Sequence, residues 1–436
     1  MEKYMNVMIE VESLIEGGTF QEGARLPSIR QLAERFHVSK STVIRALQEL
    51  EKRHIIYAVP KSGYYLIKND KKQEREQTGI IDFAASAPDP DIFPYRDFQH
   101  CINKAIDMYK NDLFIYGTPQ GLPSLIRVLQ TLLSDYQVFA KERNIFITSG
   151  VQQALSLLSL MPFPNGKKKI LIEQPGYHLM VEQLEALRLP ACGIKRTAEG
   201  LDMAEVERLF QTEEIKFFYT MPRFHNPLGS SLTEWQKREL VRLAEAYDVY
   251  LVEDDFLGDL EDNQKADPLY AYDLSSRVIY LKSFSKMIFP GLRVGAAVLP
   301  DSLAPVFHTY KKLSDIDCSM ISQAALEVYI KSGMFKRHKE KIRASYRARS
   351  ELLQNALQEY DGFSVKQTSI HTHLVLEKSL SASRVVQRLK AQGVLVEPID
   401  SHYLSDFPKE NIIKLNVSNV KTGDITRGIK MLMDCL

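Results

Sequence analysis

Apolar residues recur at every third or fourth position in three stretches of the first fifty residues. This spacing places them on one face of a helix and therefore predicts three amphipathic helices. Ser28 and Ser39 stand where the second and third helices begin, and serine is a preferred N-cap residue. Only His37-Val38 separates these two helices, which predicts a helix-turn-helix. The three apolar faces consist of Val7, Ile9, Val11, Leu14 and Ile15, then Ile29, Leu32, Ala33 and Phe36, then Val43, Ala46, Leu47 and Leu50.

Apolar and polar residues alternate after the third helix. The alternation covers 55–59 and 64–67 and surrounds the turn residues Pro60-Lys61-Ser62-Gly63. Alternation on both sides of such a turn predicts a two-stranded wing behind the helix-turn-helix.

From Ile81 onward, short apolar runs alternate with longer helical patterns. Near-continuous apolar strands separated by helices predict an α/β domain with a largely parallel sheet that is covered on both faces. The stretch 69–80, NDKKQEREQTGI, has almost no apolar side chains and predicts a flexible linker. The expected strands are Asn144–Thr148, Lys169–Glu173, Ile215–Thr220, Val249–Glu253, Val278–Lys282 and Gly295–Leu299, with helices such as Val151–Leu160 and Glu234–Ala246.

Composition is that of an ordinary globular protein, with 436 residues, 44% hydrophobic and 25% charged. This length suggests two or three domains. Four widely spaced cysteines without a C-x-x-C pair support neither a disulfide framework nor a zinc ribbon, so we expect no metal. The absence of a signal sequence and of an apolar run near 18 residues indicates a soluble cytoplasmic protein.

The net charge of +1 hides one basic element. Residues 25–68 contain nine lysines and arginines but only three acids, which is the pattern expected of contacts to DNA phosphates. Arg30 and Lys61 are the expected phosphate clamps, and Lys40, Ser41 and Thr42 can reach base edges. A helical hairpin with a solvated charged face is the alternative. The predicted DNA-binding residues are Arg25, Ser28, Arg30, Ser39, Lys40, Ser41, Thr42, Arg45, Lys61 and Gly63.

A group of polar residues follows the strand predicted at Val278–Lys282. Ser283, Ser285 and Arg293 offer two hydroxyls and a guanidinium, which suit a dianionic phosphate. Lys286 beside them can condense with an aldehyde to give an imine. Together these residues predict a site for pyridoxal 5′-phosphate (PLP). Alternatively, the stretch is a turn whose serines and lysine face water.

Polar residues also follow the other predicted strands, and ligands of parallel sheets gather at such strand ends. The helix that begins at Val151-Gln152 offers free N–H groups to the phosphate. Tyr177 can stack on a flat ring, Asn226 can bond a ring oxygen, and Asp254 can pair with a pyridine nitrogen. Each feature alone also fits a helix cap, a core tyrosine or a turn, but the ordered set favours one site.

Residues 26–50, LPSIRQLAERFHVSKSTVIRALQEL, together with the wing resemble the DNA-binding domain of the GntR family of bacterial regulators. The set of strand-end residues resembles the fold-type-I PLP aminotransferases over about 81–436. The combination resembles the MocR subfamily of GntR regulators. The resemblance implies a winged helix-turn-helix at 1–68, a linker at 69–80 and an effector domain at 81–436, with a large part to about 300 and a small part from about 301.

The same resemblance assigns roles to single residues. Lys286 would be the Schiff-base lysine, Asp254 the partner of the pyridine nitrogen, Asn226 the partner of the phenolic oxygen and Tyr177 the stacking ring. The phosphate would be held by Ser283, Ser285, Arg293 and the Val151-Gln152 turn. Tyr116 would reach the phosphate of a neighbouring subunit, which implies a homodimer.

Two positions depart from the pattern of the aminotransferase family. Phe256 stands where a second tyrosine often bonds the phenolic oxygen, so the imine is expected to titrate differently. Lys414, in NIIKLNVS, stands where an arginine binds the substrate carboxylate. Because lysine lacks the bidentate fork, either the carboxylate is held more weakly or the ligand is not a simple amino acid. A surface lysine after a strand is the alternative for Lys414. His371 lies where the family keeps a histidine, and its role is open.

The sequence leaves three functions in view. The first is a PLP-dependent transcription regulator that binds double-stranded operator DNA as a homodimer and senses a small amino compound through an aldimine at Lys286. The second is a working aminotransferase that carries a DNA-binding domain. The third is a regulator that senses PLP itself.

Overall fold

The computed structural model describes residues 3–16, 20, 24–52, 55–59, 62–66, 79–261, 263, 266–360 and 369–436. The chain forms two compact units, Met1–Ile80 and Ile81–Leu436. The expected linker lies outside the described residues except for its last two positions, and so do Pro60, Lys61 and Ile67 of the expected wing.

The first unit contains the expected helix-turn-helix and wing. Its helices are α1 (Lys3–Glu16), α2 (Ile29–Arg35) and α3 (Lys40–Lys52), and its strands are β1 (Ile56–Val59) and β2 (Gly63–Leu66), which pair antiparallel. Ser28 forms a capping box with Gln31 at the start of α2, and the Ser39 hydroxyl accepts from the Thr42 N–H at 3.2 Å. Both predicted caps are confirmed.

The loop before α2 extends the wing, which the sequence pattern did not indicate. Leu26 N–H donates to the Tyr64 carbonyl at 2.8 Å and Leu66 N–H to the Ala24 carbonyl at 3.0 Å. Arg25, between these two contacts, forms a β-bridge with Tyr65. Backbone hydrogen bonds therefore join the loop to β2, and Arg25 lies beside the wing.

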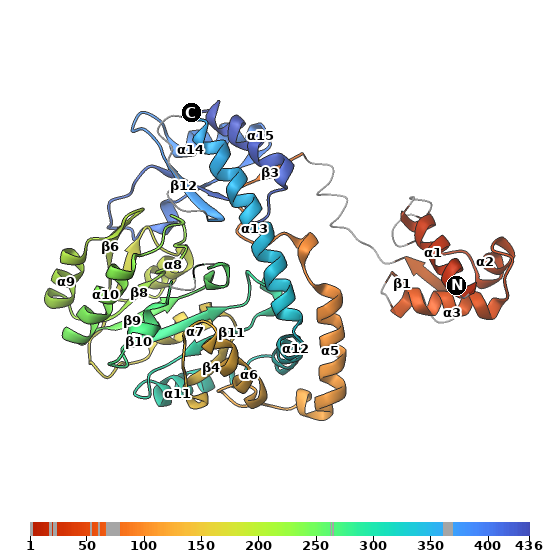
Figure 1. Cartoon of the computed structure of the whole chain (residues 1–436), viewed down its shortest axis with the longest axis horizontal. Coiled ribbons are helices and arrows are strands. Elements are labelled where there is room, and N and C mark those ends of the chain that lie inside the picture. The colour runs from red at the N-terminus through yellow and green to blue at the C-terminus, as the bar shows by residue number, and fades with distance from the viewer. Residues whose placement is uncertain are drawn as a thin grey trace. The chain divides into compact units, whose positions relative to one another are not determined.

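An eight-stranded sheet organises the second unit, in the order β4-β11-β10-β9-β8-β5-β6-β7 (Figure 1). The six expected strands are present to within one residue at either end. The strands are β4 (Ile145–Thr148), β5 (Lys169–Gln174), β6 (Ala191–Thr197), β7 (Gly200–Leu201), β8 (Ile215–Thr220), β9 (Tyr250–Asp254), β10 (Val278–Ser283) and β11 (Gly295–Val298).

Both faces of this sheet are covered, as expected. Ile170 and Ile172 of β5 pack into one apolar cluster, whereas Leu171 between them packs into another. The first cluster includes Leu155 of α7 (Val151–Leu160), and the second includes Leu240 of α10 (Glu234–Ala246). Because successive side chains of a strand point to opposite faces, helices must lie on both sides.

Strand directions bring the carboxyl ends of six strands, β6 among them, to one edge. Strands β10, β9, β8, β5 and β6 run parallel. Strand β11 is antiparallel to both β10 and β4, so β4 points the same way as β10. The carboxyl ends of β4, β5, β6, β8, β9 and β10 and the start of β11 therefore share an edge.

A smaller sheet, β12-β15-β14, forms the C-terminal part, from β12 (His371–Val375), β15 (Ile412–Asn416) and β14 (Glu397–Pro398). The first strand of the unit, β3 (Ile81–Asp82), pairs parallel with β13 (Val394–Leu395). Figure 1 shows the 25-residue helix α13 (Met334–Gln358) running from the large sheet toward this part.

The remaining helices surround these sheets. No helix among the described residues is long and apolar enough to cross a membrane. The remaining helices are α5 (Tyr95–Tyr109), α6 (Pro123–Ser134), α8 (His178–Ala186), α9 (Met203–Thr212), α11 (Ala304–Asp315), α12 (Met320–Lys331), α14 (Ala382–Ala391) and α15 (Thr422–Met433).

Candidate functional site

Lys286 lies just beyond the end of β10 and is half-buried. Its Nζ donates to the carbonyl of Ser86, and the Tyr346 hydroxyl of α13 donates to the Lys286 carbonyl at 3.4 Å. Loss of hydration and the nearby Lys414 ammonium lower the pKa of Lys286 to about 7 from the ordinary 10.5. A large fraction of this amine is thus unprotonated at neutral pH, the form that attacks a carbonyl carbon.

Asp254 ends β9, the strand next to β10, and is opposite Leu281 in the register. Its Oδ2 accepts from the Tyr219 hydroxyl at 2.8 Å. Burial raises the pKa of Asp254 to about 7. Its other oxygen, Oδ1, is buried and has no hydrogen-bond partner among the described residues.

Asn226 and Tyr177 follow β8 and β5 at the same edge. Asn226 is 7% exposed, and its Oδ1 is a second buried atom without a partner in the described part of the chain. Burial and the Asp254 carboxylate raise the pKa of Tyr177 to about 12, whereas Arg293 opposes this rise. Tyr177, Asp254 and Arg293 therefore lie within electrostatic reach of one another.

Arg293 lies two positions before the start of β11, in the left-handed region, with φ of +53°. Its Nη2 donates to the Ser149 carbonyl at 2.7 Å, next to the start of α7. Gly150, with φ of +78°, precedes that helix, and a Cβ there would lie 2.9 Å from Arg293 Nη2. The guanidinium thus lies against the N-terminus of α7, where a phosphate is also favoured.

The phosphate-binding candidates meet around this point. Ser283 ends β10, the Ser285 N–H donates to its hydroxyl at 3.3 Å, and Val151 and Gln152 form the first turn of α7. An amine of lowered pKa and an anion cup share one sheet edge with four buried oxygens that have no partner among the described residues, those of Thr148, Gln152, Asn226 and Asp254. These residues fit PLP, because Asp254 can accept from the ring nitrogen, the Asn226 amide can bond the phenolic oxygen and the anion cup suits the phosphate.

Replacing Gly150 by alanine should weaken PLP binding about ten- to hundredfold, because the new Cβ displaces Arg293 and a hydrogen bond to a charged group is worth about 1.5–3 kcal/mol. Gly166→Ala is the matched control, since Gly166 also has positive φ (+68°) but nothing lies within 4 Å of its added Cβ. Equilibrium binding of PLP measures both variants. Equal losses in the two would contradict the placement of Arg293.

Lys414 is buried in the middle of β15, which excludes a surface lysine. Its Nζ lies 2.9 Å from Glu397 Oε2. Phe256 packs beside His371, with ring centroids 6.0 Å apart. The Nδ1 atom of His371 lies 2.9 Å from Nδ2 of Asn416. This histidine therefore contacts β15, the strand that also carries Lys414.

Tyr116 is 79% exposed. Two further apolar side chains beside it, Phe114 and Ile115, are 66% and 64% exposed. Within this chain Tyr116 therefore lies on the surface.

The described members of the predicted DNA-binding set are exposed or partly exposed in the first unit. Arg30 is paired with Glu34 at 3.0 Å, and both side chains are exposed. The hydroxyls of Ser41 and Thr42 each lie 2.8 Å from that of Ser39 at the start of α3, and Lys40 is exposed beside them. The remaining members differ in detail: Arg45 stacks on Tyr4 at 4.2 Å, Arg25 lies against Gly63, and Lys61 falls outside the described residues.

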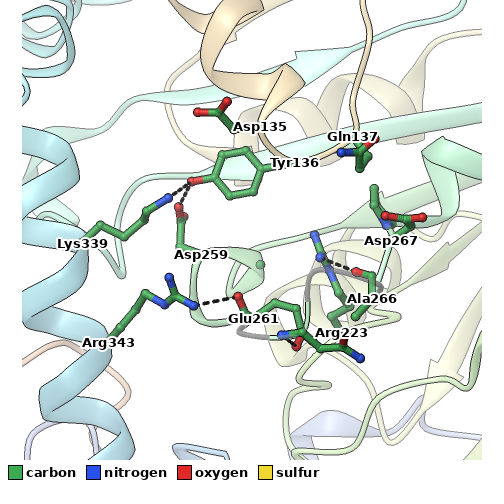
Figure 2. A pocket seen from close by; sticks show the side chains of 13 residues that line it. Asp135, Tyr136, Gln137, Arg223, Asp259, Glu261, Ala266, Asp267, Lys339 and Arg343 are labelled. Atoms are coloured by element: carbon green, nitrogen blue, oxygen red, sulfur yellow. Dashed lines mark hydrogen bonds between the residues drawn. The ribbon is translucent and has the colours of Figure 1, made fainter.

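A separate cavity of about 410 Å³ lies beside α13 (Figure 2). Several of the polar side chains that line it bond one another or the backbone. Lys339 donates to Tyr136 at 3.1 Å, Tyr136 donates to Asp259, and Arg343 donates to the Glu261 carbonyl at 2.9 Å. These contacts tie α13 to the loop after β9.

Several residues of the site were missed in the sequence. Tyr219 was accessible to prediction, because a hydroxyl within the apolar strand 215–220 needs a buried partner. Ser86, Glu397 and Tyr346 have no local signal, since each meets the site from a distant part of the chain.

Comparison with known families divides the sequence in the same way. Residues 78–432 match the family described as aminotransferase class I and II, and residues 3–66 match the gntR family of bacterial regulatory proteins. The HTH-type transcriptional regulator YcxD of Bacillus subtilis is 71% identical over the full length of both chains. Aromatic-amino-acid aminotransferase 1 of Thermococcus litoralis is 27% identical, covering 83% of this chain and 89% of its own.

Among solved structures, the kynurenine aminotransferase of Pyrococcus horikoshii, in complex with PMP, superposes with a TM-score of 0.75 at 27% identity. The match covers 83% of this chain and 92% of that one. The predicted fold class, a winged helix-turn-helix with a fold-type-I aminotransferase domain, is confirmed. The chain therefore belongs to the aminotransferase class I and II family and carries a gntR-family domain ahead of it, which is the combination found in MocR-type regulators.

Proposed function

We propose that this protein is a PLP-dependent transcription regulator that responds to an amino compound at Lys286. The observation that carries the proposal is the meeting of Lys286, Asp254 and Arg293 at one sheet edge, in a chain that also holds a gntR-family domain. The relative that is 71% identical bears the name of a transcriptional regulator.

When bound, PLP supplies an aldehyde and an electron-withdrawing ring. Lys286 would provide the amine to which the aldehyde attaches. Asp254 would hold the ring nitrogen with Oδ1, which has no partner among the described residues, and the Asn226 amide would bond the phenolic oxygen. Tyr177 would cover the ring, while Ser283, Ser285, Arg293 and the first turn of α7 would hold the phosphate.

The regulator acts as a homodimer on double-stranded DNA. Tyr116 is exposed in one chain together with Phe114 and Ile115, as expected of a residue that serves the phosphate site of a partner subunit. Two winged helices would then contact paired half-sites.

A working aminotransferase is the second candidate function. The lysine and the carboxylate that such an enzyme needs are both in place, and a relative that is 27% identical bears an aminotransferase name. Repeated formation of keto acid from an amine and a keto-acid acceptor would favour the enzyme over the regulator.

DNA affinity in three forms of the full-length protein tests the regulator. The probe is a duplex that the protein selects from random-sequence DNA, and the forms are without PLP, with PLP, and with PLP plus a panel of primary amines. We expect an amine to change the affinity of the PLP-loaded form, because a ligand shifts DNA binding only by its different affinity for two states. A change caused by PLP alone would instead identify a PLP sensor, and identical affinities in all forms would refute the proposal.

Arg30→Ala serves as the DNA-contact variant in the same assay. Removal of one phosphate contact from each subunit of the dimer should reduce the slope of log affinity against log salt by about 1.8, which is about 0.9 per contact. Arg384→Ala, at an exposed position in α14 of the other unit, is the control. An unaltered slope would remove Arg30 from the DNA contacts.

A further inference from the structure

An ion pair lies across two strands of the C-terminal sheet. Lys414 of β15 is directly opposite Glu397 of β14 in the register, and Lys414 Nζ is 2.9 Å from Glu397 Oε2. The Lys414 side chain is 1% exposed, whereas that of Glu397 is 30% exposed. The lysine charge is thus buried behind a carboxylate that still meets solvent.

This pair faces the candidate PLP site. Lys414 and Asn416 are two positions apart on β15, so they point to the same face of the sheet. Asn416 donates to the Ser86 hydroxyl at 3.4 Å, and Ser86 accepts from Lys286 Nζ through its carbonyl. The Lys414 ammonium also contributes to the lowered pKa of Lys286.

Three imidazoles lie around the pair, and Lys286 and Glu182 are also within electrostatic reach of one of them, His178. Burial, followed by the Lys414 charge, lowers the pKa of His178 and of His371, and lowers that of His402 to about 3. Glu397 acts on His178 in the opposite direction. These histidines are therefore neutral near pH 7. Among the described residues around the pair, the cation opposite a ligand carboxylate is Lys414, which Glu397 already neutralises.

A carboxylate on an incoming amine would have to share Lys414 with Glu397. Lysine is a point charge without the fork that lets arginine hold a carboxylate bidentately, and two carboxylates on one ammonium repel each other. An amine without a carboxylate meets no such conflict. Its other polar groups can instead bond the partly exposed Glu397.

We propose that Glu397 is a specificity-determining residue that occupies the carboxylate position on Lys414, so that the effector is a primary amine without a carboxylate on its amine-bearing carbon. This inference rests on the proposed function, because it takes Lys286 as the place where the amine reacts. The sequence alone favoured Lys414 as a site for the effector carboxylate, and the ion pair with Glu397 changes that assignment.

Absorbance titration of the PLP-loaded full-length protein tests the inference with two matched pairs of probes. These are L-phenylalanine with 2-phenylethylamine, and L-leucine with 3-methylbutylamine. We expect half-saturation by each amine at a concentration at least about tenfold below that of its amino acid, a difference of about 1.4 kcal/mol. This comparison needs no variant.

Glu397→Gln keeps the shape of the side chain and frees the Lys414 charge. We expect both amino acids to bind about tenfold more tightly to this variant, with little change for the amines, because only the amino acids bring a carboxylate. Glu410→Gln is the matched control, since Glu410 also pairs with a lysine, Lys195, but at an exposed position. That variant should behave as the wild type.

The outcomes separate the two proposals. If the wild type responds to the probes but prefers the amino acids, or if Glu397→Gln leaves the preference unchanged, the inference is overturned and the proposed function stands. If PLP is bound and none of the four probes changes its absorbance, the proposed function fails and the inference fails with it. Should Glu397→Gln not fold, the wild-type comparison alone decides.

Discussion

Lys286→Ala should lose the absorbance band of lysine-bound PLP completely and, with it, every change of DNA affinity caused by amines. The alanine has no amine to attach the aldehyde, while the fold should persist because Lys286 is only half-buried. Lys312→Ala, an exposed lysine of α11, is the control. An unchanged band in Lys286→Ala would overturn the assignment of the Schiff-base lysine.

The lowered pKa of Lys286 predicts how the rate of PLP attachment depends on pH. With a pKa of about 7 instead of 10.5, the rate at which PLP attaches to the PLP-free protein should rise through pH 7 and level off above about pH 8, since only the unprotonated amine reacts. Stopped-flow absorbance records this profile. A rate that continues to rise toward pH 10 would show that the lowered pKa of Lys286 is wrong.

Asp254→Asn should stabilise the PLP-free protein and weaken its binding of PLP. Burial raises the pKa of Asp254 from 3.8 to about 7, and a difference of this size corresponds to a penalty on the order of 4 kcal/mol, at about 1.4 kcal/mol per tenfold change in proton affinity. Because the folded-state pKa is the higher one, stability falls as pH rises from about 4 and the penalty is complete above pH 7. Asparagine removes the charge and keeps an acceptor for Tyr219.

Thermal unfolding of the PLP-free protein at pH 4.5 and pH 8.5 measures this effect, and the gain in Asp254→Asn should be larger at pH 8.5. PLP affinity should fall about ten- to hundredfold, because a charge-assisted hydrogen bond of about 1.5–3 kcal/mol to the ring nitrogen is lost. Tyr219→Phe should instead destabilise the PLP-free protein, since it removes the hydroxyl that donates to the buried Asp254 carboxylate. A less stable Asp254→Asn at pH 8.5 would contradict an unpaired charge at this position.

Local patterns in the sequence were sufficient to predict the helices and strands and to predict which residues follow each strand. Strand Ile215–Thr220 and helix Val151–Leu160 have the expected bounds, because apolar periodicity and caps determine them locally. Strand direction is different: an apolar run such as 295–299 looks the same whether it is parallel or antiparallel, and β11 is antiparallel to both of its neighbours.

Pairings between distant parts of the chain could not be predicted in this way. The sequence marks Lys414 by its position in NIIKLNVS, but nothing local connects it to Glu397, which joins it only when β14 and β15 pair. The same holds for Ser86 and Lys286, which are 200 positions apart. The partners of charged site residues were therefore the part of the site that required the structure.

The short strand β3 connects the start of the second unit with the candidate site. Directly after the linker, Ile81 and Asp82 pair with β13, the Phe83 carbonyl accepts from the Asn416 N–H at 2.8 Å, and the Ser86 carbonyl accepts from Lys286 Nζ. Residues 81–86 thus form one short segment that begins with the first strand of the second unit and ends at the residue that contacts the Lys286 amine. A group that takes the Lys286 amine away from Ser86 is expected to remove one hydrogen bond from the end of this segment, while Asn416 still holds Phe83 and Ser86.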